Sequence, residues 1–265
     1  MGRVVITGGR RVTRRHLLIV SALTAVLVLP PAGTFLAADK QQPPGDARGL
    51  YSYREASRDG IGKVYMGREI SFVLGHRGTV WLEREEREVT EKPDLLVDIM
   101  ELAPDEVVVD LGAGSGYFTF RISPRVPRGR VLAVDIQPEM LEFIEQRRQQ
   151  ENAINVETVL GEITDPGLEP SSVDAVLMVD AYHEFSHPRE MMEAIVRALR
   201  PGGRVLLVEY RAEDPDVPML PLHKMTQQQA RKEMTAVGLE WVKTRDELPW
   251  QHFMVFRKPA VSKEP

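Results

Sequence analysis

The feature that most constrains this chain is an apolar run that ends in an acid and is followed by evenly spaced glycines. The run 107–109 is Val-Val-Val, Asp110 closes it, and glycines stand at 112, 114 and 116. Such a run predicts a buried strand, and glycines allow a sharp turn and the close approach of a ligand. A helix expected over about 116–123 would turn its positive N-terminal end toward the loop, which suits an anionic group.

A second acid stands where a nucleotide ribose would need one. The apolar run 131–134 predicts the next strand, and Asp135 ends it. An acid at the tip of that strand is placed to bind the two hydroxyls of a ribose. The glycines recur at every second position, unlike the G-x-G-x-x-G of dinucleotide sites. The residues alone still leave open a nicotinamide-nucleotide site, or a glycine-rich turn in another α/β protein.

The stretch from Asp110 to Gly116, together with Asp135, resembles the first motif of class I S-adenosylmethionine-dependent methyltransferases. The stretch 199–205 looks like the turn before the fifth strand of that family. The resemblance implies that Asp110 holds the methionine ammonium, directly or through the loop geometry, and that Glu162 binds the adenine amino group, with Asp165 as a competitor. The cofactor contacts that it implies are Asp110, Gly112, Ala113, Gly114, Gly116, Tyr117, Asp135, Ile136, Glu162, Ile163 and Asp180.

Four further stretches, 62–69, 178–185, 208–211 and 248–252, resemble a bacterial group of predicted exported methyltransferases. Among better-known families the chain is similar to the quinone-biosynthesis and arsenite methyltransferase type. Arsenic chemistry relies on cysteines, however, and this chain has none.

Apolar strand patterns alternate with helical patterns from residue 93 onward. This alternation predicts an α/β fold, a doubly wound and mostly parallel seven-stranded sheet of the Rossmann-like methyltransferase type. The short link through Pro249 and Trp250 indicates that the last two strands form an antiparallel pair. The methyltransferase domain is expected over 93–258, followed by a tail at 259–265.

The region before this domain divides into three predicted parts. Residues 39–60 are polar and predict a linker. Residues 61–92 are too few for a core of their own and predict an N-terminal helical cap over the main domain, with a partly helical pattern at 63–70. Residues 1–38 predict a signal peptide or a membrane anchor, because five arginines precede a short apolar run and no acid occurs before Asp39.

The fourth predicted domain strand ends in the run Asp180-Ala181-Tyr182-His183-Glu184. In the family this position faces the transferable methyl group. If the acceptor is a hydroxyl, His183 is the candidate base, with Glu184 or Asp180 orienting it. The alternative is that His183 is structural and that alignment alone supplies the rate.

Possible metal ligands are scattered along the chain. Acids and histidines of this kind more often belong to ordinary hydrogen-bond networks, so the sequence predicts no metal site. The acids and histidines considered are Asp180, His183, Glu184, Glu209, His223 and His252.

The net charge of −5 argues against nucleic acid as the main partner. The predicted function is S-adenosylmethionine-dependent methyl transfer to a small molecule, with S-adenosyl-L-methionine as cofactor. The N-terminus predicts export, by a twin-arginine or a general route, or anchoring to the membrane. Export would separate the enzyme from a donor made in the cytoplasm, so the alternative is an exported, catalytically silent binding protein of the same fold. The sequence leaves the acceptor and the oligomeric state open.

Overall fold

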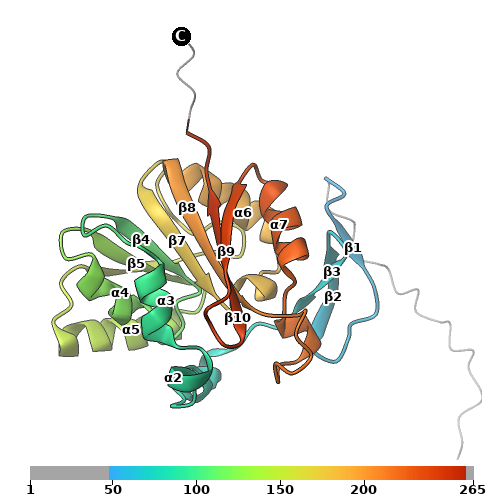
Figure 1. The fold of residues 1–265 in the computed structure, drawn as a ribbon, viewed down its shortest axis with the longest axis horizontal. Coiled ribbons are helices and arrows are strands. Elements are labelled where there is room, and N and C mark those ends of the chain that lie inside the picture. Colours follow the sequence, from blue (N-terminus) through green and yellow to red (C-terminus); the bar gives the residue numbers. More distant parts are fainter. Residues whose placement is uncertain (1–47, 261–265) are drawn as a thin grey trace, which may run out of the picture. The chain divides into compact units, whose positions relative to one another are not determined.

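The large sheet forms because apolar strands alternate with helices along the chain. The computed structural model describes residues 48–260. Its seven-stranded sheet has the order β6-β5-β4-β7-β8-β10-β9 (Figure 1). The strands are β4 (Val107–Leu111), β5 (Arg130–Asp135), β6 (Val156–Leu160), β7 (Val173–Val179), β8 (Leu199–Tyr210), β9 (Glu240–Arg245) and β10 (Gln251–Arg257). Pairing is parallel from β6 through β8, whereas β10 is antiparallel to β8 and β9, which confirms the predicted fold.

Helices cover both faces of this sheet because successive strand residues point to opposite sides. Val108 packs in one core with α3 (Pro93–Ile99), α4 (Thr119–Ile122) and α5 (Pro138–Glu151). Val109 packs in the other core with α6 (Pro188–Ala198) and α7 (Gln227–Thr235). Because β4, β5 and β7 run parallel, their carboxyl ends meet at one edge of the sheet. Open α/β sheets bind their ligands at this edge.

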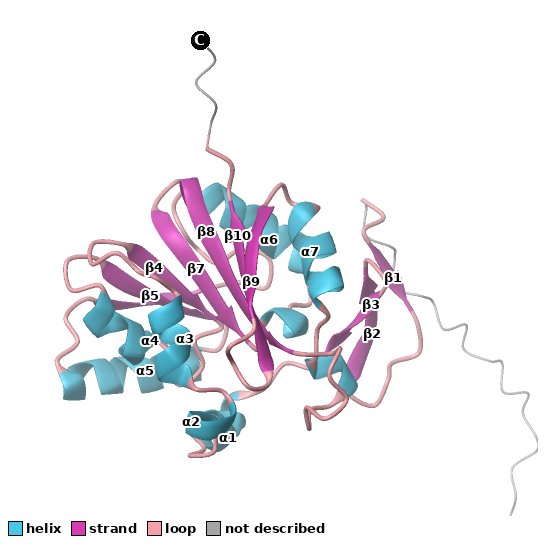
Figure 2. Cartoon of the chain, in the orientation of Figure 1, coloured by secondary structure: helices cyan, strands magenta, loops and turns pink. Residues whose placement is uncertain are grey.

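The structure corrects the predicted helical cap at its N-terminal end. Residues 60–71 form a hairpin, β2 (Gly60–Tyr65) and β3 (Arg68–Ser71), and β1 (Tyr51–Tyr53), which lies in the predicted linker, pairs with β2. The two turn residues, Met66 and Gly67, have φ values of 49° and 100°. Two consecutive positive φ values give the turn that best matches the twist of a hairpin. Figure 2 shows this small sheet apart from the large one and beside α7.

The helical part of the cap is limited to three short pieces. They are η1 (His76–Gly78), α1 (Thr79–Leu82) and α2 (Arg87–Thr90). Within residues 48–260 no helix is long and apolar enough to cross a membrane. The predicted signal or anchor at 1–38 and the end of the tail at 261–265 lie outside the described residues, and both stay predictions.

A buried acid, Glu69 on β3, ties the hairpin to the loop before it. Its Oε1 accepts from the backbone N–H groups of Ser57 and Gly62 at 2.9 and 3.0 Å, and its Oε2 accepts from Arg54 at 2.7 Å. Burial acts to raise the pKa of Glu69, but the hydrogen bonds from Ser57, Arg54 and Gly62 outweigh it and lower the pKa to about 2. The carboxylate therefore stabilises the small sheet wherever it is ionised.

We expect Glu69→Gln to reduce the free energy of unfolding by about 2 kcal/mol at neutral pH, since charged hydrogen bonds are lost. Because the folded pKa lies below the unfolded value of about 4.3, wild type should lose this contribution as the pH falls from about 4.3 to about 2. Urea unfolding across that range should converge for the two proteins. Glu55→Gln, at an exposed position of the same region, is the control, and parallel curves for wild type and Glu69→Gln would contradict the assignment.

Candidate active site

The loop after β4 needs glycine for both conformation and space. Gly112 and Gly114 have φ values of 73° and 55°, which disfavour other residues. A Cβ on Gly112 would lie 2.8 Å from the Cβ of Ala181, and one on Gly114 would lie 2.7 Å from Leu82 Cδ1. The loop is therefore packed between the segment after β7 and the cap. The helix after it, α4, starts at Thr119 and has four residues, so it begins later and is shorter than the helix expected over about 116–123.

A cavity of about 390 Å³ opens beside this loop at the carboxyl ends of β4, β5 and β7. It gathers most of the residues that the sequence assigned to the site. These are Gly112, Gly114, Asp135, Ile136, Glu162, Ile163, Asp180, His183 and Glu184. Asp165 is not among the lining residues, and its Oδ1 accepts from the backbone N–H of Gly167 at 2.9 Å. Of the two acids that competed for this loop, Glu162 is the one at the cavity.

Four predicted contact residues, Asp110, Ala113, Gly116 and Tyr117, do not line the cavity. Asp110 is buried and accepts from the Thr119 hydroxyl at 2.6 Å, so it holds the far side of the loop. Burial is the main reason that its pKa rises to about 6. The Tyr117 hydroxyl donates to Glu88 at 2.7 Å. Asp110 thus acts through the loop geometry, and contact of these four residues with the cofactor stays a prediction.

Asp135 joins the glycine loop to the end of β5. Its Oδ2 accepts from the backbone N–H of Gly114 and its Oδ1 from that of Gln137, both at 2.9 Å. Burial raises its pKa, although these backbone hydrogen bonds act in the opposite direction. Ile136 and Ile163, both exposed, also line the cavity. The two backbone hydrogen bonds thus fix the Asp135 carboxylate at the cavity wall.

Asp180 brings an unpaired oxygen to the cavity. Its Oδ2 accepts from Gln251 Nε2 at 2.6 Å, while its Oδ1 is buried with no hydrogen-bond partner among residues 48–260. Burial raises the pKa of Asp180 well above its ordinary value, and the carboxylates of Glu91 and Glu209 act in the same direction. The cost of a buried unpaired oxygen would be relieved by a positively charged or hydrogen-bonding ligand.

His183 is held by Glu209, not by Asp180 or Glu184 as the sequence suggested. Its Nδ1 lies 2.6 Å from Glu209 Oε2, and its backbone N–H donates to Oε1 of the same carboxylate at 3.2 Å. A carboxylate only accepts, so Nδ1 carries a proton, and in the neutral ring Nε2 has the lone pair, 3.1 Å from His223 Nδ1. Burial would lower the pKa of His183, but the adjacent Glu209 carboxylate raises it.

Sequence reasoning missed the role of Glu209, although the register contained a signal. Val179 at the end of β7 pairs with Val208 of the parallel strand β8. The next residues along the two strands, Asp180 just after β7 and Glu209 near the end of β8, must therefore lie at the same sheet edge. His183 comes one short turn later and reaches back to that edge.

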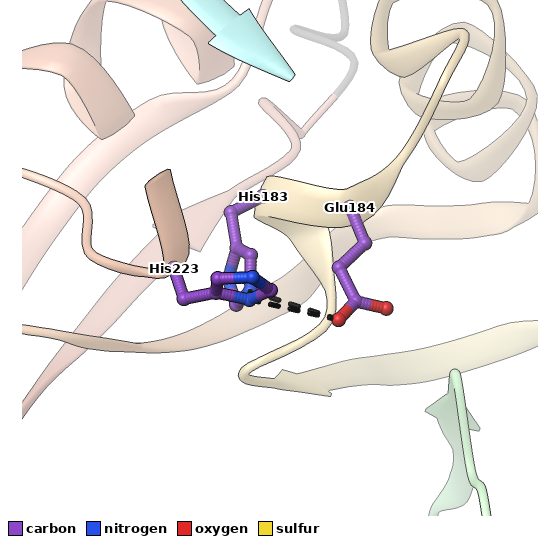
Figure 3. Close-up of side chains that lie close together, drawn as sticks. All are labelled: His183, Glu184 and His223. Carbon is purple, nitrogen blue, oxygen red and sulfur yellow. Dashed lines mark hydrogen bonds and ion pairs between the residues drawn. The ribbon is translucent and has the colours of Figure 1, made fainter. Parts of the chain in front are cut away.

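Figure 3 shows His183 and Glu184 beside His223, which belongs to another segment, η4 (Pro221–His223). His183 Nε2 and His223 Nδ1 are 3.1 Å apart, and each lies 3.9 Å from Glu184 Oε1. The other carboxylate oxygen of Glu184 accepts from the backbone N–H of Leu74 at 2.9 Å. Residues 183–187 have the H-E-x-x-H spacing, but the second histidine of the cluster is His223, from a distant segment, and not His187.

The cap forms one wall of the cavity through residues that the sequence did not assign to the site. Leu74, Trp81, Leu82, Arg84 and Arg87 line it, as does Gln137 from the domain. Gln137 accepts from the backbone N–H of His76 at 2.8 Å and donates to the carbonyl of Leu74 at 3.1 Å. The hairpin braces the opposite side, because Arg68 donates to the carbonyl of His183 at 3.0 Å.

Comparison with known proteins adds a family to this geometry. A family model described as a methyltransferase domain matches residues 102–254. The chain is 35% identical over 124 residues to the arsenite methyltransferase of Halobacterium salinarum, a match that covers 45% of this chain and 32% of the relative. It is 29% identical over 145 residues to the demethylmenaquinone methyltransferase of Lactococcus lactis, which covers 54% and 56% of the two chains.

The fold has solved counterparts. A SAM-dependent methyltransferase from Aquifex aeolicus superposes with a TM-score of 0.66 at 20% identity, and the match covers 70% of this chain and all of that one. The chain spans between 32% and 56% of the length of eight curated relatives that it matches. The family match, residues 102–254, spans the large sheet and its glycine loop, and the cap lies before this match begins.

Proposed function

The chain belongs to the methyltransferase domain family, and on this basis we propose that it transfers the methyl group of S-adenosylmethionine to a small-molecule acceptor. The observation that carries the proposal is the cavity itself. One continuous space joins the glycine loop, the carboxylate of Asp135 and the segment 180–184. A donor bound along the loop would thus reach the residues at the end of β7, where the family places its chemistry.

The residues present fit this donor. Asp135 would accept from the two ribose hydroxyls, since a carboxylate has lone pairs beyond those used by Gly114 and Gln137. Ile136 and Ile163 would flank the adenine ring, with Glu162 near its amino group. The buried, unpaired Oδ1 of Asp180 would face the positive methionine end. Gly112 and Gly114 have no side chains, so a ligand in the cavity can approach the backbone of the loop closely.

Bound S-adenosylmethionine supplies a methyl group on a positively charged sulfur, which is a strong electrophile. The protein's task is then to hold an acceptor in line with that methyl group and to keep water away. Phe185, Met191, Met219 and Leu220 line the cavity beyond Asp180. We propose that these apolar side chains bind the acceptor and that the cap segment around Trp81 and Leu82 closes over both ligands.

The acceptor that we propose is a small organic molecule. The relative from Halobacterium salinarum is named for arsenite, but this chain has no cysteine to bind arsenic. An apolar wall with a few polar groups at its end is typical of sites for small organic ligands.

The donor site is tested by Asp135→Ala. We expect the affinity for S-adenosylmethionine to fall by about 10- to 150-fold, or about 1.5–3 kcal/mol, because hydrogen bonds from the ribose to a charged acceptor are lost. Isothermal titration calorimetry with the donor and with its demethylated product measures this. Asp165→Ala, in the neighbouring loop but outside the cavity, should bind like wild type. Wild type that shows no binding at millimolar donor would overturn the proposed function.

A further inference from the structure

Three side-chain atoms at the inner end of the cavity lie at the separations that a metal ion requires. His183 Nε2, His223 Nδ1 and Glu184 Oε1 form a triangle with sides of 3.1, 3.9 and 3.9 Å (Figure 3). The point equidistant from these atoms lies about 2.1 Å from each, within the range of Zn–N and Zn–O bonds in proteins. All three residues line the cavity, so one side of that point faces the space where an acceptor would bind.

The surroundings of His183 provide a second, independent observation. Glu209 is fully buried, and its carboxylate binds Nδ1 at 2.6 Å, which directs the free lone pair of Nε2 toward His223 and Glu184. A carboxylate behind a histidine, on the ring nitrogen opposite the ligating one, is the usual support of a metal-binding imidazole. If His183 only formed a hydrogen bond to His223, a buried carboxylate on Nδ1 would not be required.

The third ligand is supported in the same manner. Glu184 uses Oε2 to accept from the backbone N–H of Leu74, which leaves Oε1 for the triangle. His223 lies on a short turn that begins at Pro221, and its side chain is 22% exposed. It is the member of the cluster that can shift toward an ion without disturbing the core.

We propose that His183 Nε2, His223 Nδ1 and Glu184 Oε1 bind a divalent transition-metal ion, Zn²⁺ by this donor set, with a fourth position open to the cavity. Two imidazoles and one carboxylate with an open position form a known donor set of catalytic zinc. Nitrogen-rich sites of this kind select against Mg²⁺ and Ca²⁺, which prefer oxygen. His183 is then a ligand and not the free base that the sequence suggested.

The metal site restricts the acceptor to molecules that carry a hydroxyl group. This extension rests on the proposed function. The open position would take an acceptor hydroxyl, because a bound cation lowers the pKa of a coordinated O–H group. The hydroxyl proton passes to water, and the oxygen forms its bond to the methyl carbon. The carbon–sulfur bond breaks with its electron pair on sulfur, so the products are a methyl ether and a neutral thioether.

The test uses the full chain without a histidine tag, stripped of metal by a chelator and then titrated with Zn²⁺ alone. We expect one equivalent to bind, and Co²⁺ in its place to give the visible absorption of a tetrahedral N/O site. His223→Ala and Glu184→Gln should each weaken Zn²⁺ binding by about 100-fold or more. His183 is avoided as a test position, because its removal leaves Glu209 buried without its partner.

His252→Gln is the matched control. His252 is also buried and contacts two carboxylates, Glu213 and Asp246, but through opposite ring nitrogens that cannot meet at one ion. This variant should bind Zn²⁺ like wild type. Wild type that binds S-adenosylmethionine but neither Zn²⁺ nor Co²⁺ would overturn the metal site alone, as would unchanged Zn²⁺ binding in folded His223→Ala and Glu184→Gln. Zn²⁺ binding without donor binding would instead overturn the proposed function and leave the site standing.

Discussion

Gly112→Ala should lower the affinity for S-adenosylmethionine by about 30-fold or more. The left-handed backbone at this position costs a residue with a Cβ about 1–2 kcal/mol. The new methyl group would also lie 2.8 Å from the Cβ of Ala181, and relieving such overlap costs about 1–3 kcal/mol. The loop and the segment after β7 must then move apart, so the two halves of the donor site separate. Calorimetric titration of the folded variant measures the loss.

Gly202→Ala separates backbone strain from the clash. Gly202 has φ 80°, but a Cβ there would have nothing within 4 Å, and the residue lies outside the cavity. We expect this variant to lose about 1–2 kcal/mol of stability and to bind the donor normally. Equal binding losses in the two variants would show that the contact between Gly112 and Ala181 does not position the site.

Glu91→Ala should reduce the free energy of unfolding by about 3–5 kcal/mol. Glu91 is 1% exposed and binds Arg87 Nε at 2.7 Å, the Tyr210 hydroxyl at 2.8 Å, and Arg84. Without this carboxylate, the buried guanidinium of Arg87 keeps no anionic partner. Since Arg84 and Arg87 line the cavity, donor affinity should fall as well. Chemical denaturation and donor titration of the same variant test both effects.

Glu88→Ala is the control for that experiment. Glu88 is also on the short helix α2, but it is 49% exposed and its ion pair joins it to Arg121 at the surface. Exposed ion pairs contribute about 0–1 kcal/mol, so the stability should change little. A loss as large as that of Glu91→Ala would mean that the cost comes from the helix and not from the buried charges.

The large sheet and its glycine loop were predictable because their signals are local. Strand runs such as 107–109 and 175–179 are apolar and continuous, and each is followed by an acid that the parallel order brings to one edge. The hairpin at 60–71 was not predictable in the same manner. Its strands carry the charged residues Lys63 and Glu69 at buried positions, so the alternation of apolar and polar residues typical of a strand is obscured. Its turn also uses Met66, a residue other than glycine, in a left-handed conformation.

The proposed donor half of the site followed from the sequence, whereas the cluster around His183 did not. Asp135 ends β5 and Glu162 is the second residue after β6, so topology alone places both at the sheet edge. His223 comes 40 residues after His183 and joins it only through the loop that follows β8. No pattern within one segment can show that pair, or the use of Glu209 as the partner of His183.

The hairpin that braces the carbonyl of His183 has a consequence for how such enzymes diversify. The family match begins at residue 102, yet Arg68 and Leu74 hold residues 183 and 184 in place. The family domain and the residues that position its segment 183–184 therefore lie in different stretches of the chain. Under the proposed function, mutation of Arg68 would shift the residues that face the acceptor without touching the glycine loop or Asp135. Two chains alike from residue 102 onward would, for that reason, differ in the acceptor that they bind.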